Sequence, residues 1–555
     1  MPQETSKSAK PGGTLKDFLT ADIQHFDATI SERAAVAGSF SAWCYPRMLK
    51  YKLATYPDLG DGTSVGDAAT AYEISGDKMQ ITFKIRQGMK WDSRAPTNGR
   101  ALDAQDVLFS WKKFAELNPA ASNLANARSP SAAVTSVEAP DNQTIVVKLV
   151  RPDATVIPGF TAFDHFYVMP RESAGGFDPM VEVRGAGPWQ VEEFVPSARM
   201  VYRRNSDYYE SGRPYPDRLE CPIIADYSQL LAQFKSGNIY TNVALPQDAI
   251  QTKKDSPNAN MIQTDRFLTA GNYLTFGYDG ASIFRDKRMR QALSLTIDAE
   301  GYVEGVENRS AFESQGVDLE WARNTAVWAG WGDYWLDPDD KDAFGDNNKY
   351  LHLNIEESKA LMSAAGFPQG AEFTFGYSSE RYGAIYLRNA DVFAGMFREA
   401  GMKVNQDAVP YQKYQEVYSR DGNLFAFNGV TMRAGRAWGS VAAQLFGTMH
   451  KDGSIYHGMS ANNSNYEQGD PKVNDLTEKI KLEYDTKKQE DLVHQLIRYV
   501  TGEATAISQP ATSKAYTVTW PALGNFGVFT SYPGGAKAAE TMINYWIDST
   551  KPPLA

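Results

Sequence analysis

The segment ITFKIRQGMKWD, residues 81–92, carries the clearest structural signal in this chain. Its first residues alternate, with apolar Ile81, Phe83 and Ile85 separated by polar threonine and lysine. Because successive side chains of a strand point to opposite faces, this period of two predicts a strand with one buried face. A Ser-Gly-Asp turn at 75–77 precedes it, so the segment is expected to be the second strand of a hairpin.

A helix signal follows in LDAQDVLFSW, residues 102–111. Asp103 is placed to cap a helix, with Asp106 three residues later as the acidic partner of a capping box. Apolar residues then recur near helical spacing as far as Phe114. A second hairpin is predicted at 134–149, with Pro-Asp-Asn as its turn. This first part of the chain therefore combines hairpins with a helix.

Strand and helix patterns stay intermixed along the rest of the chain. Strands are expected at 189–194, 200–204, 273–278 and 373–377, and helices at 288–297, 385–399 and 485–500, with further helices capped by Ser228 and Asn354. This mixture predicts an α/β or α+β class.

Length and composition limit the classes of protein that are possible. A chain of 555 residues is longer than one hydrophobic core normally organises, so we expect two or more domains. With 42% hydrophobic and 22% charged residues, the composition is typical of a soluble globular protein. The net charge is −11 and the sequence has no basic stripe, which argues against nucleic-acid binding. No apolar run approaches the length of a membrane span.

The N-terminus and the cysteines bear on cellular location. Residues 1–13 are polar and contain proline, glycine and serine, as in the tether that remains after a secretion signal is removed. We therefore expect the precursor to carry a signal or a lipidated cysteine. Cys44 and Cys221 are too few for a disulfide scaffold, and two separate buried thiols are favoured over one bridge.

The sequence carries no signature of catalysis or of a metal site. It has no GxSxG, no GxxxxGK[ST] and no GxGxxG after a strand. The histidines form no HExxH or HxH pair, and His450 and His457 are assigned to surface or core roles. The aspartates of 337–346 lack the glycine of an EF-hand loop and indicate a solvated acidic loop. We expect no enzymatic activity, no metal and no cofactor.

Several segments, taken in order, resemble one known family. They are the strand and helix at 81–111, GAGPW at 185–189 with RNSDYY at 204–209, QLLAQFKSGNI at 229–239, FRDKRMRQALSLTID at 284–298, and KALMSAAGFPQG at 359–370. In these segments the chain resembles the family-5 extracellular solute-binding proteins of ABC importers, the peptide- and nickel-type binders. Their order and spacing carry the resemblance, since each segment alone is a weak signal.

The resemblance implies a two-lobed, periplasmic-binding-protein-like (type II) α/β fold with an extra domain and a ligand cleft between the lobes. Lobe I would comprise residues 1–45, with a tether to about 11, then 186–277 and 511–555; the extra domain would be 46–185 and lobe II 278–510. Phe276, Gln509 and Pro510 would lie at the hinges. Closure of the lobes would bury the ligand, because only the closed form contacts it from both sides.

The resemblance also implies a function. The chain would be a monomeric substrate-binding component that captures a peptide or a similar oligomeric polar solute. It would deliver this ligand to the transmembrane subunits of an ABC permease. The location would be periplasmic or extracellular, with lipid anchoring in the full-length precursor.

One stretch departs from the family pattern. Peptide binders have an acid in a segment that corresponds to FNGVTMRAGRAWGSVAAQLF, residues 427–446, where it pairs with the peptide amine. This stretch has no acid and instead has Arg433, Arg436 and Trp438. Guanidinium groups at a cleft would favour a carboxylate, a phosphate or sugar hydroxyls. The alternative is that both arginines face solvent on a loop.

Phe427 and Asn428 open the same stretch and are counted with it as candidate ligand contacts. Aromatic residues supply the other candidates: Trp328, Trp331 and Trp335, together with Trp43 and Tyr45 near the first expected crossover and Trp520 near the last. Aromatic rings stack on sugar rings and on apolar parts of peptides, although such residues more often belong to a core.

The ligand class stays open at this point. Peptides lead by family frequency, and oligosaccharides follow because the acid is missing and aromatic residues are plentiful. A glycan-processing enzyme would need two carboxylates about 5–10 Å apart in the cleft. A sensor-type binding module that never meets a transporter is a third alternative.

Overall fold

The computed structural model describes residues 2–23, 25–30, 43–162, 166–242, 245–263, 266–419, 423–435, 438–458, 466–532 and 538–554. The chain divides into two compact units. Unit 1 comprises Met1–Arg266 and Ala515–Ala555, and unit 2 comprises Phe267–Lys514. Among the described helices, none is long and apolar enough to cross a membrane.

Unit 1 is built from small sheets and short helices. Its strands are β1 (Thr14–Lys16), β2 (Leu49–Tyr51), β3 (Ala54–Thr55), β4 (Ser64–Gly66), β5 (Ala69–Ile74), β6 (Gln80–Ile85), β7 (Val134–Asp141), β8 (Thr144–Leu149), β9 (Trp189–Val195), β10 (Arg199–Arg204), β11 (Arg218–Pro222), β12 (Thr241–Asn242), β13 (Asn260–Gln263), β21 (Tyr516–Thr519), β22 (Leu523–Gly524), β23 (Phe529–Thr530) and β24 (Trp546–Ile547). Its helices are α2 (Ala104–Leu117), α3 (Val156–Thr161), α4 (Tyr227–Lys235), α5 (Pro246–Asp255) and α16 (Ala539–Met542), with short 3-10 turns at Ser6–Ser8, Pro119–Asn123 and Arg171–Ser173.

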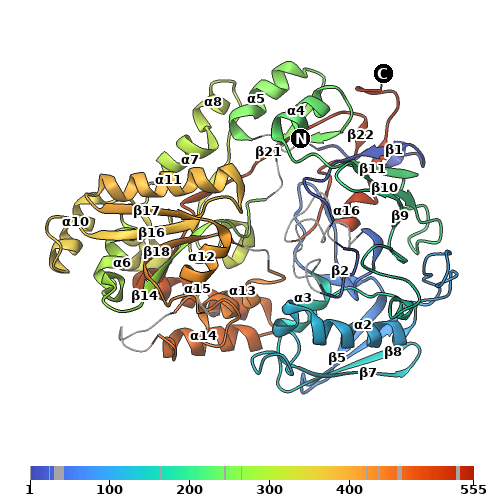
Figure 1. The fold of residues 1–555 in the computed structure, drawn as a ribbon, viewed down its shortest axis with the longest axis horizontal. Coiled ribbons are helices and arrows are strands. Elements are labelled where there is room, and N and C mark those ends of the chain that lie inside the picture. The colour runs from blue at the N-terminus through green and yellow to red at the C-terminus, as the bar shows by residue number, and fades with distance from the viewer. Residues whose placement is uncertain are drawn as a thin grey trace. The chain divides into compact units, whose positions relative to one another are not determined.

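The alternating residues 81–85 belong to β6, an inner strand of one of these sheets. Strands β5, β6, β8 and β7 lie in that order, all antiparallel, and α2 lies against β7 and β8 (Figure 1). Ile81 and Phe83 are fully buried, which confirms the predicted alternation. The Asp103 carboxylate accepts hydrogen bonds from the backbone N–H groups of Gln105 and Asp106. The Asp106 carboxylate in turn accepts a hydrogen bond from the backbone N–H of Asp103. The predicted capping box is therefore confirmed.

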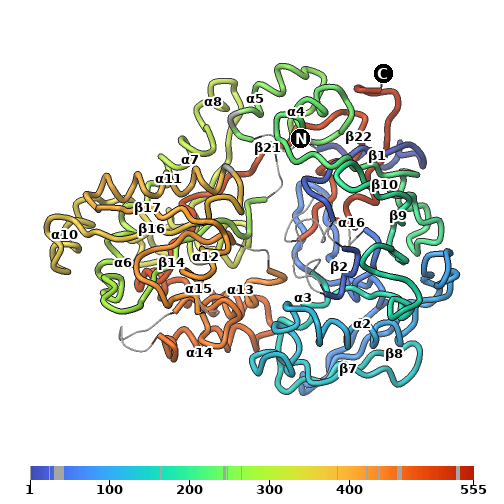
Figure 2. Tube along the Cα trace, in the orientation of Figure 1, coloured from blue at the N-terminus to red at the C-terminus, as the bar shows by residue number. Residues whose placement is uncertain are grey.

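The last residues of the chain complete unit 1 beside its first strand. β1 pairs in parallel with β11 at the edge of the sheet β1-β11-β10-β9. β24, near the C-terminus, contacts β1, and the trace in Figure 2 shows the red C-terminal segment running beside the blue N-terminal one. β21 lies between β12 and β13 in a second sheet. Unit 1 is therefore discontinuous in sequence, with strands from both ends of the chain.

Unit 2 is formed by one continuous segment. Its strands are β14 (Tyr273–Tyr278), β15 (Trp321–Arg323), β16 (Glu372–Ser378), β17 (Lys403–Val409), β18 (Asn428–Arg433), β19 (Ala506–Ser508) and β20 (Ala511–Ser513). Its helices are α6 (Lys287–Ser294), α7 (Ala299–Glu307), α8 (Arg309–Glu313), α9 (Lys341–Phe344), α10 (Ile355–Ala364), α11 (Gly383–Glu399), α12 (Tyr411–Tyr418), α13 (Val441–Met449), α14 (Pro471–Leu482) and α15 (Thr486–Glu503), with 3-10 turns at Ile283–Arg285, Ala329–Tyr334 and Gly345–Leu351.

The main sheet of unit 2 has the order β17-β16-β18-β14-β19. β16 is parallel to β17 and β18, whereas β14 runs antiparallel to both of its neighbours. Five consecutive residues of β14 are buried, as expected for a strand covered on both faces. α11 lies along β17 and α12 contacts β16 (Figure 1), while α13, α14 and α15 pack successively against one another. The small β15–β20 ladder lies outside this sheet.

Most predicted elements are present, with small differences at their ends. Asn354 caps α10 and Asp485 caps α15, and α11 begins two residues before the predicted start at 385. The predicted helix N-cap at Ser228 is wrong. The Asp226 carboxylate accepts from the Gln229 N–H and starts α4 one residue before Ser228, because a carboxylate is at least as good an N-cap as a hydroxyl.

The residues expected at the hinges lie inside unit 2. Phe276 is fully buried in the middle of β14, so the chain has already entered this unit before residue 277. Gln509 and Pro510 lie between β19 and β20, ahead of the return to unit 1 at Ala515. The division between the compact units at 266/267 and 514/515 thus differs from the expected lobe boundaries at 277/278 and 510/511, which remain predictions, as does the hinge role.

Candidate ligand-binding pocket

A pocket with a volume of about 100 Å³ lies within unit 2. Its lining comes from the entry to β14, the turn from α6 to α7, the loop after β15, the loop after β18, the last turns of α13 with the segment that follows, and the chain from the end of α15 through β19 to Pro510. At roughly 30 Å³ for each water of the liquid, this volume corresponds to about three water molecules. The pocket is therefore large enough for a small chemical group.

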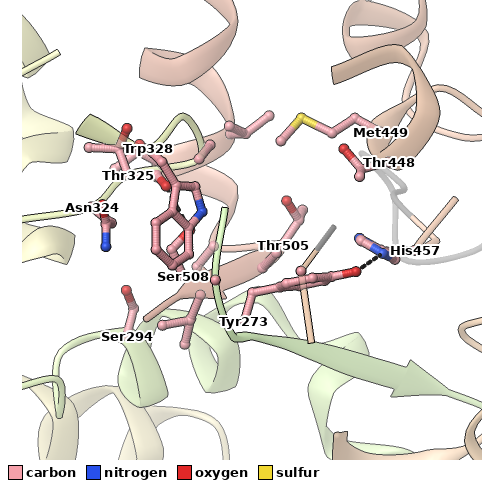
Figure 3. Close-up of a pocket in the computed structure, with 18 of the residues that line it drawn as sticks. Tyr273, Ser294, Asn324, Thr325, Trp328, Thr448, Met449, His457, Thr505 and Ser508 are labelled. Carbon is pink, nitrogen blue, oxygen red and sulfur yellow. Dashed lines mark hydrogen bonds between the residues drawn. The ribbon is translucent and has the colours of Figure 1, made fainter. Parts of the chain in front are cut away.

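Aromatic side chains form two sides of the pocket. Figure 3 shows the Trp328 indole on one side, with Thr448 and Met449 across the pocket from it and the Tyr273 ring, seen edge-on, below. Trp328 is only 3% exposed, so the rest of its ring is packed in protein. Trp438 also lines the pocket and is 5% exposed. Two of the tryptophans proposed from sequence therefore line the same cavity.

Two glycines make this arrangement possible. A Cβ atom on Gly271 would lie 2.3 Å from Cη2 of Trp328, so the indole can occupy its place only over a glycine. The Gly435 N–H donates to the carbonyl oxygen of Gly271 at 2.9 Å, and a Cβ on Gly435 would lie 2.3 Å from that oxygen. This contact extends the β14–β18 pairing beyond Arg433 and holds the loop after β18 against the pocket.

Some polar groups of the lining are already used in local structure. The Ser508 hydroxyl donates to the Thr325 carbonyl at 2.6 Å, and the Thr325 hydroxyl donates to the Val327 carbonyl at 2.7 Å. The Asn324 amide donates to the Gln509 carbonyl at 3.0 Å. These bonds tie the loop that carries Trp328 to β19 and its flank, so the indole is held by a satisfied backbone network.

Other polar groups have hydrogen-bonding capacity to spare. Trp331 Nε1 donates to Gln444 Oε1 at 2.7 Å. Because an indole N–H can only donate, this bond assigns the oxygen of the Gln444 amide and leaves its NH₂ group available. Within the described part of the chain, neither that NH₂ group nor the hydroxyls of Thr501 and Thr505 has a partner, and all three residues line the pocket. No sequence pattern singles out Gln444, Thr501 or Thr505 as a ligand contact.

His457 forms the far end of the pocket. Its Nε2 lies 3.2 Å from the Tyr273 hydroxyl, and the two rings are 5.1 Å apart (Figure 3). His457 is 3% exposed, and its backbone N–H donates to the Thr448 carbonyl. The sequence predicts a surface or core role for His457. The residue is buried, and it also lines the candidate site.

The described lining contains no carboxylate, ammonium or guanidinium group. None of the lining residues is an aspartate, glutamate, lysine or arginine. Arg436 belongs to the stretch between the lining residues Gly435 and Trp438, but it lies outside the described residues. The lining is otherwise divided between apolar side chains and neutral hydrogen-bonding groups.

Arg433 has a different environment from the one its sequence suggests. Its guanidinium donates to the Thr275 hydroxyl, the Ser419 hydroxyl, and the carbonyl oxygens of Tyr418 and Leu424, over 2.6–3.1 Å. The residue is 7% exposed, so it does not face solvent on a loop. Four of the five N–H donors of the guanidinium are thus used within unit 2, which favours a structural role.

The remaining candidates are dispersed. Phe427 packs with Tyr414 and Tyr418 in a buried cluster, and Asn428 next to it is exposed. Trp331 supports Gln444 without lining the pocket, and Trp335 Nε1 donates to the Arg323 carbonyl at 3.1 Å. In unit 1, Trp43 and Tyr45 are fully buried and Trp520 stacks on Phe234, with Nε1 donating to the Phe234 carbonyl at 2.8 Å.

Comparison with known proteins identifies the family. A profile of "Bacterial extracellular solute-binding proteins, family 5 Middle" matches residues 63–446, more than half of the chain. A curated relative named "Probable di/tripeptide-binding protein 5", from Pseudomonas aeruginosa (strain UCBPP-PA14), is 28% identical over 277 residues, 47% of this chain and 51% of the relative. The match thus spans about half the length of that relative.

Solved structures agree in fold over nearly the whole chain. The ABC transporter substrate-binding protein CtaP from Listeria monocytogenes gives a TM-score of 0.74 at 18% identity, covering 97% of this chain and 100% of that one. The periplasmic binding protein DppA from Helicobacter pylori, in complex with the peptide STSA, gives 0.72 at 16%, covering 98% and 100%. The chain therefore has the α/β fold of the two-lobed periplasmic binding proteins and belongs to the family-5 bacterial extracellular solute-binding proteins.

Proposed function

We propose that this protein is the substrate-binding component of an ABC importer and that it binds its ligand without chemical change. The observation that carries the proposal is the pocket of unit 2, where aromatic walls and neutral hydrogen-bonding groups without partners line one cavity in the described chain. Such a combination of apolar surface with a few placed polar groups is typical of small-molecule sites. Membership of a solute-binding family supports binding rather than catalysis.

The ligand would be a peptide or a comparable oligomeric polar solute. Support comes from the relative named as a di/tripeptide-binding protein and from the neighbour crystallised with a tetrapeptide. The protein would act as a monomer in the periplasm or outside the cell, anchored by a lipid on its full-length precursor. Ligand binding would draw the lobes together around hinges near Phe276 and near Gln509–Pro510, and the closed form would deliver the ligand to the permease.

Trp328 and Trp438 are the sequence candidates that we place in the site. A thermal-shift screen against peptide, sugar and metal-chelate libraries tests the function, since a ligand that binds only the folded state raises the melting temperature. We expect at least one compound class to raise it in a concentration-dependent manner, and Trp328→Ala to weaken the effect. Trp335→Phe, outside the lining, is the matched control and should retain it.

Two results would contradict the proposal. One is that no compound in any library stabilises the protein. The other is that a stabilising compound is consumed during incubation, as followed by mass spectrometry, since an importer component returns its ligand unchanged.

A further inference from the structure

We propose that the pocket of unit 2 receives an uncharged, hydroxyl-bearing ring of the ligand, such as one sugar residue. This inference rests on the proposed function and narrows the ligand class for the same site. Three features of the pocket support it: the charge of the lining, the hydrogen-bonding groups that lack partners among the described residues, and the aromatic walls.

The charge of the lining argues against an ionised group. A buried ammonium or carboxylate needs a fixed counter-charge or several strong hydrogen bonds, because removal from water is costly. The described lining offers no carboxylate to an ammonium, and no ammonium or guanidinium group to a carboxylate. The free amine or carboxylate end of a short peptide would therefore be poorly stabilised in this pocket. A neutral group avoids this penalty.

The polar groups without partners match hydroxyls. The Gln444 NH₂ group donates, while the Thr501 and Thr505 hydroxyls can each donate and accept. A sugar hydroxyl also does both, so it can satisfy each of these groups. The Trp331 bond fixes the direction of the Gln444 amide before any ligand arrives. An apolar peptide side chain in the same space would leave these groups without partners, which is unfavourable when they are desolvated.

The aromatic walls match the remaining surface of such a ring. A pyranose has apolar C–H faces as well as hydroxyl edges, and aromatic rings provide large, rigid apolar faces. Trp328 and Tyr273 lie on adjoining sides of the pocket, with Thr505 drawn between them and the Thr448 side (Figure 3). A ring placed here would contact aromatic carbon on two sides and polar groups at its edge. The volume of about 100 Å³ is smaller than the roughly 150 Å³ of a cavity that holds benzene, so the pocket would enclose part of one ring and not a whole oligomer.

Isothermal titration calorimetry on the full chain tests the inference. The probes are neutral oligosaccharides (cellobiose, maltotriose and mannobiose), the acidic digalacturonic acid, and the peptides dialanine and trialanine. We expect at least one neutral sugar to bind more tightly than the acidic sugar and both peptides. Thr505→Val should weaken that sugar about tenfold, which is the usual cost of one hydrogen bond. Thr135→Val, on an exposed position of β7 in unit 1, should leave the affinity unchanged.

The outcomes separate this inference from the proposed function. Binding of a peptide with no response to any neutral sugar would overturn the inference and leave the importer function standing. Tighter binding of the acidic sugar, lost in Arg436→Ala, would also overturn it, because Arg436 would then supply a charge. Neutral-sugar binding that Thr505→Val does not weaken would place the sugar outside this pocket. If a neutral sugar is bound and then hydrolysed, the proposed function fails instead.

Discussion

A buried ion pair of unit 1 and the pocket of unit 2 treat buried polar groups in different ways. Unit 1 buries an ion pair, in which Arg47 donates to Glu540 at 2.8 Å with both side chains at most 4% exposed. Its neighbour Asp67 accepts from the Arg47 backbone N–H at 2.8 Å. The pocket of unit 2 is instead lined, in its described part, by neutral side chains such as Gln444 and Thr505. The pair in unit 1 consists of buried charges, whereas the described lining of the pocket in unit 2 has no carboxylate, ammonium or guanidinium group.

The difference follows from what each region has to do. Arg47 and Glu540 belong to segments almost five hundred residues apart, so their pair connects the N-terminal and C-terminal parts of a discontinuous unit. A buried pair contributes little net stability but fixes which partner fits, since an unpaired buried charge is costly. A binding pocket has to stay solvated without a ligand and be satisfied with one. Neutral donors and acceptors do this at lower cost.

The largest expected effect comes from breaking the buried pair. Glu540→Gln leaves the Arg47 charge buried without its counter-ion and should lower the free energy of unfolding by about 3–5 kcal/mol. Urea unfolding, followed by circular dichroism, measures the change. The matched control is Glu138→Gln, which breaks an exposed pair with Lys148 and should cost at most about 1 kcal/mol. Equal losses in the two variants would mean that burial of the pair does not matter.

A smaller effect is expected from filling the space beneath Trp328. Gly271→Ala places a methyl group where the indole lies, so the ring or the backbone has to shift. Overpacking of this kind costs about 1–3 kcal/mol. Calorimetric titration should also show weaker binding of whichever ligand the screens identify.

Gly395→Ala is the control for this substitution. Gly395 lies on α11 with open space around the position of a Cβ, and alanine there should stabilise the helix by up to about 1 kcal/mol. Unchanged stability and affinity in Gly271→Ala would show that Trp328 is not held where the structure has it.

Local patterns carried most of the fold prediction. The alternation in β6 and the caps of α2, α10 and α15 depend on neighbouring residues, so they can be read from short stretches of sequence. The predicted cap of α4 was wrong because two residues that can cap a helix, Asp226 and Ser228, lie two positions apart. The order of the strands in the sheet of unit 2 was not predicted, because it depends on pairing between distant segments.

The candidate site was predicted less well, for a physical reason. The pocket gathers side chains from segments between residues 270 and 510, and no local pattern marks Gln444 or Thr505 as neighbours of Trp328. Tryptophans could be proposed because their residue type alone marks them as candidates for contact with a ligand. The environment of Arg433 could not be read from sequence, because its acceptors are two hydroxyls and two backbone carbonyls that no sequence motif groups together. Residue type suggested candidates, and only the three-dimensional arrangement could separate them.

The smallest expected effect concerns Glu307, a half-buried acid in unit 2 that has no cation beside it among its described contacts. Burial raises the pKa of Glu307 above its ordinary value of 4.5, and the hydrogen bond from the Ser513 hydroxyl at 2.9 Å only partly offsets this. Between pH 4.5 and the raised pKa, the unfolded chain has released this proton while the folded chain keeps it. Stability from this group is therefore fully present below pH 4.5 and is lost as the pH rises through the raised pKa.

Urea unfolding from pH 4.5 to 8 tests this expectation. Because Glu307→Gln cannot titrate, its free energy of unfolding should vary less with pH than that of the wild type. Glu399→Gln, at an exposed position on α11, is the control and should keep the wild-type slope. Identical slopes in the wild type and Glu307→Gln would mean that the carboxyl is solvated, and the contrast between Glu540 of unit 1, which is paired with Arg47, and this acid would no longer hold.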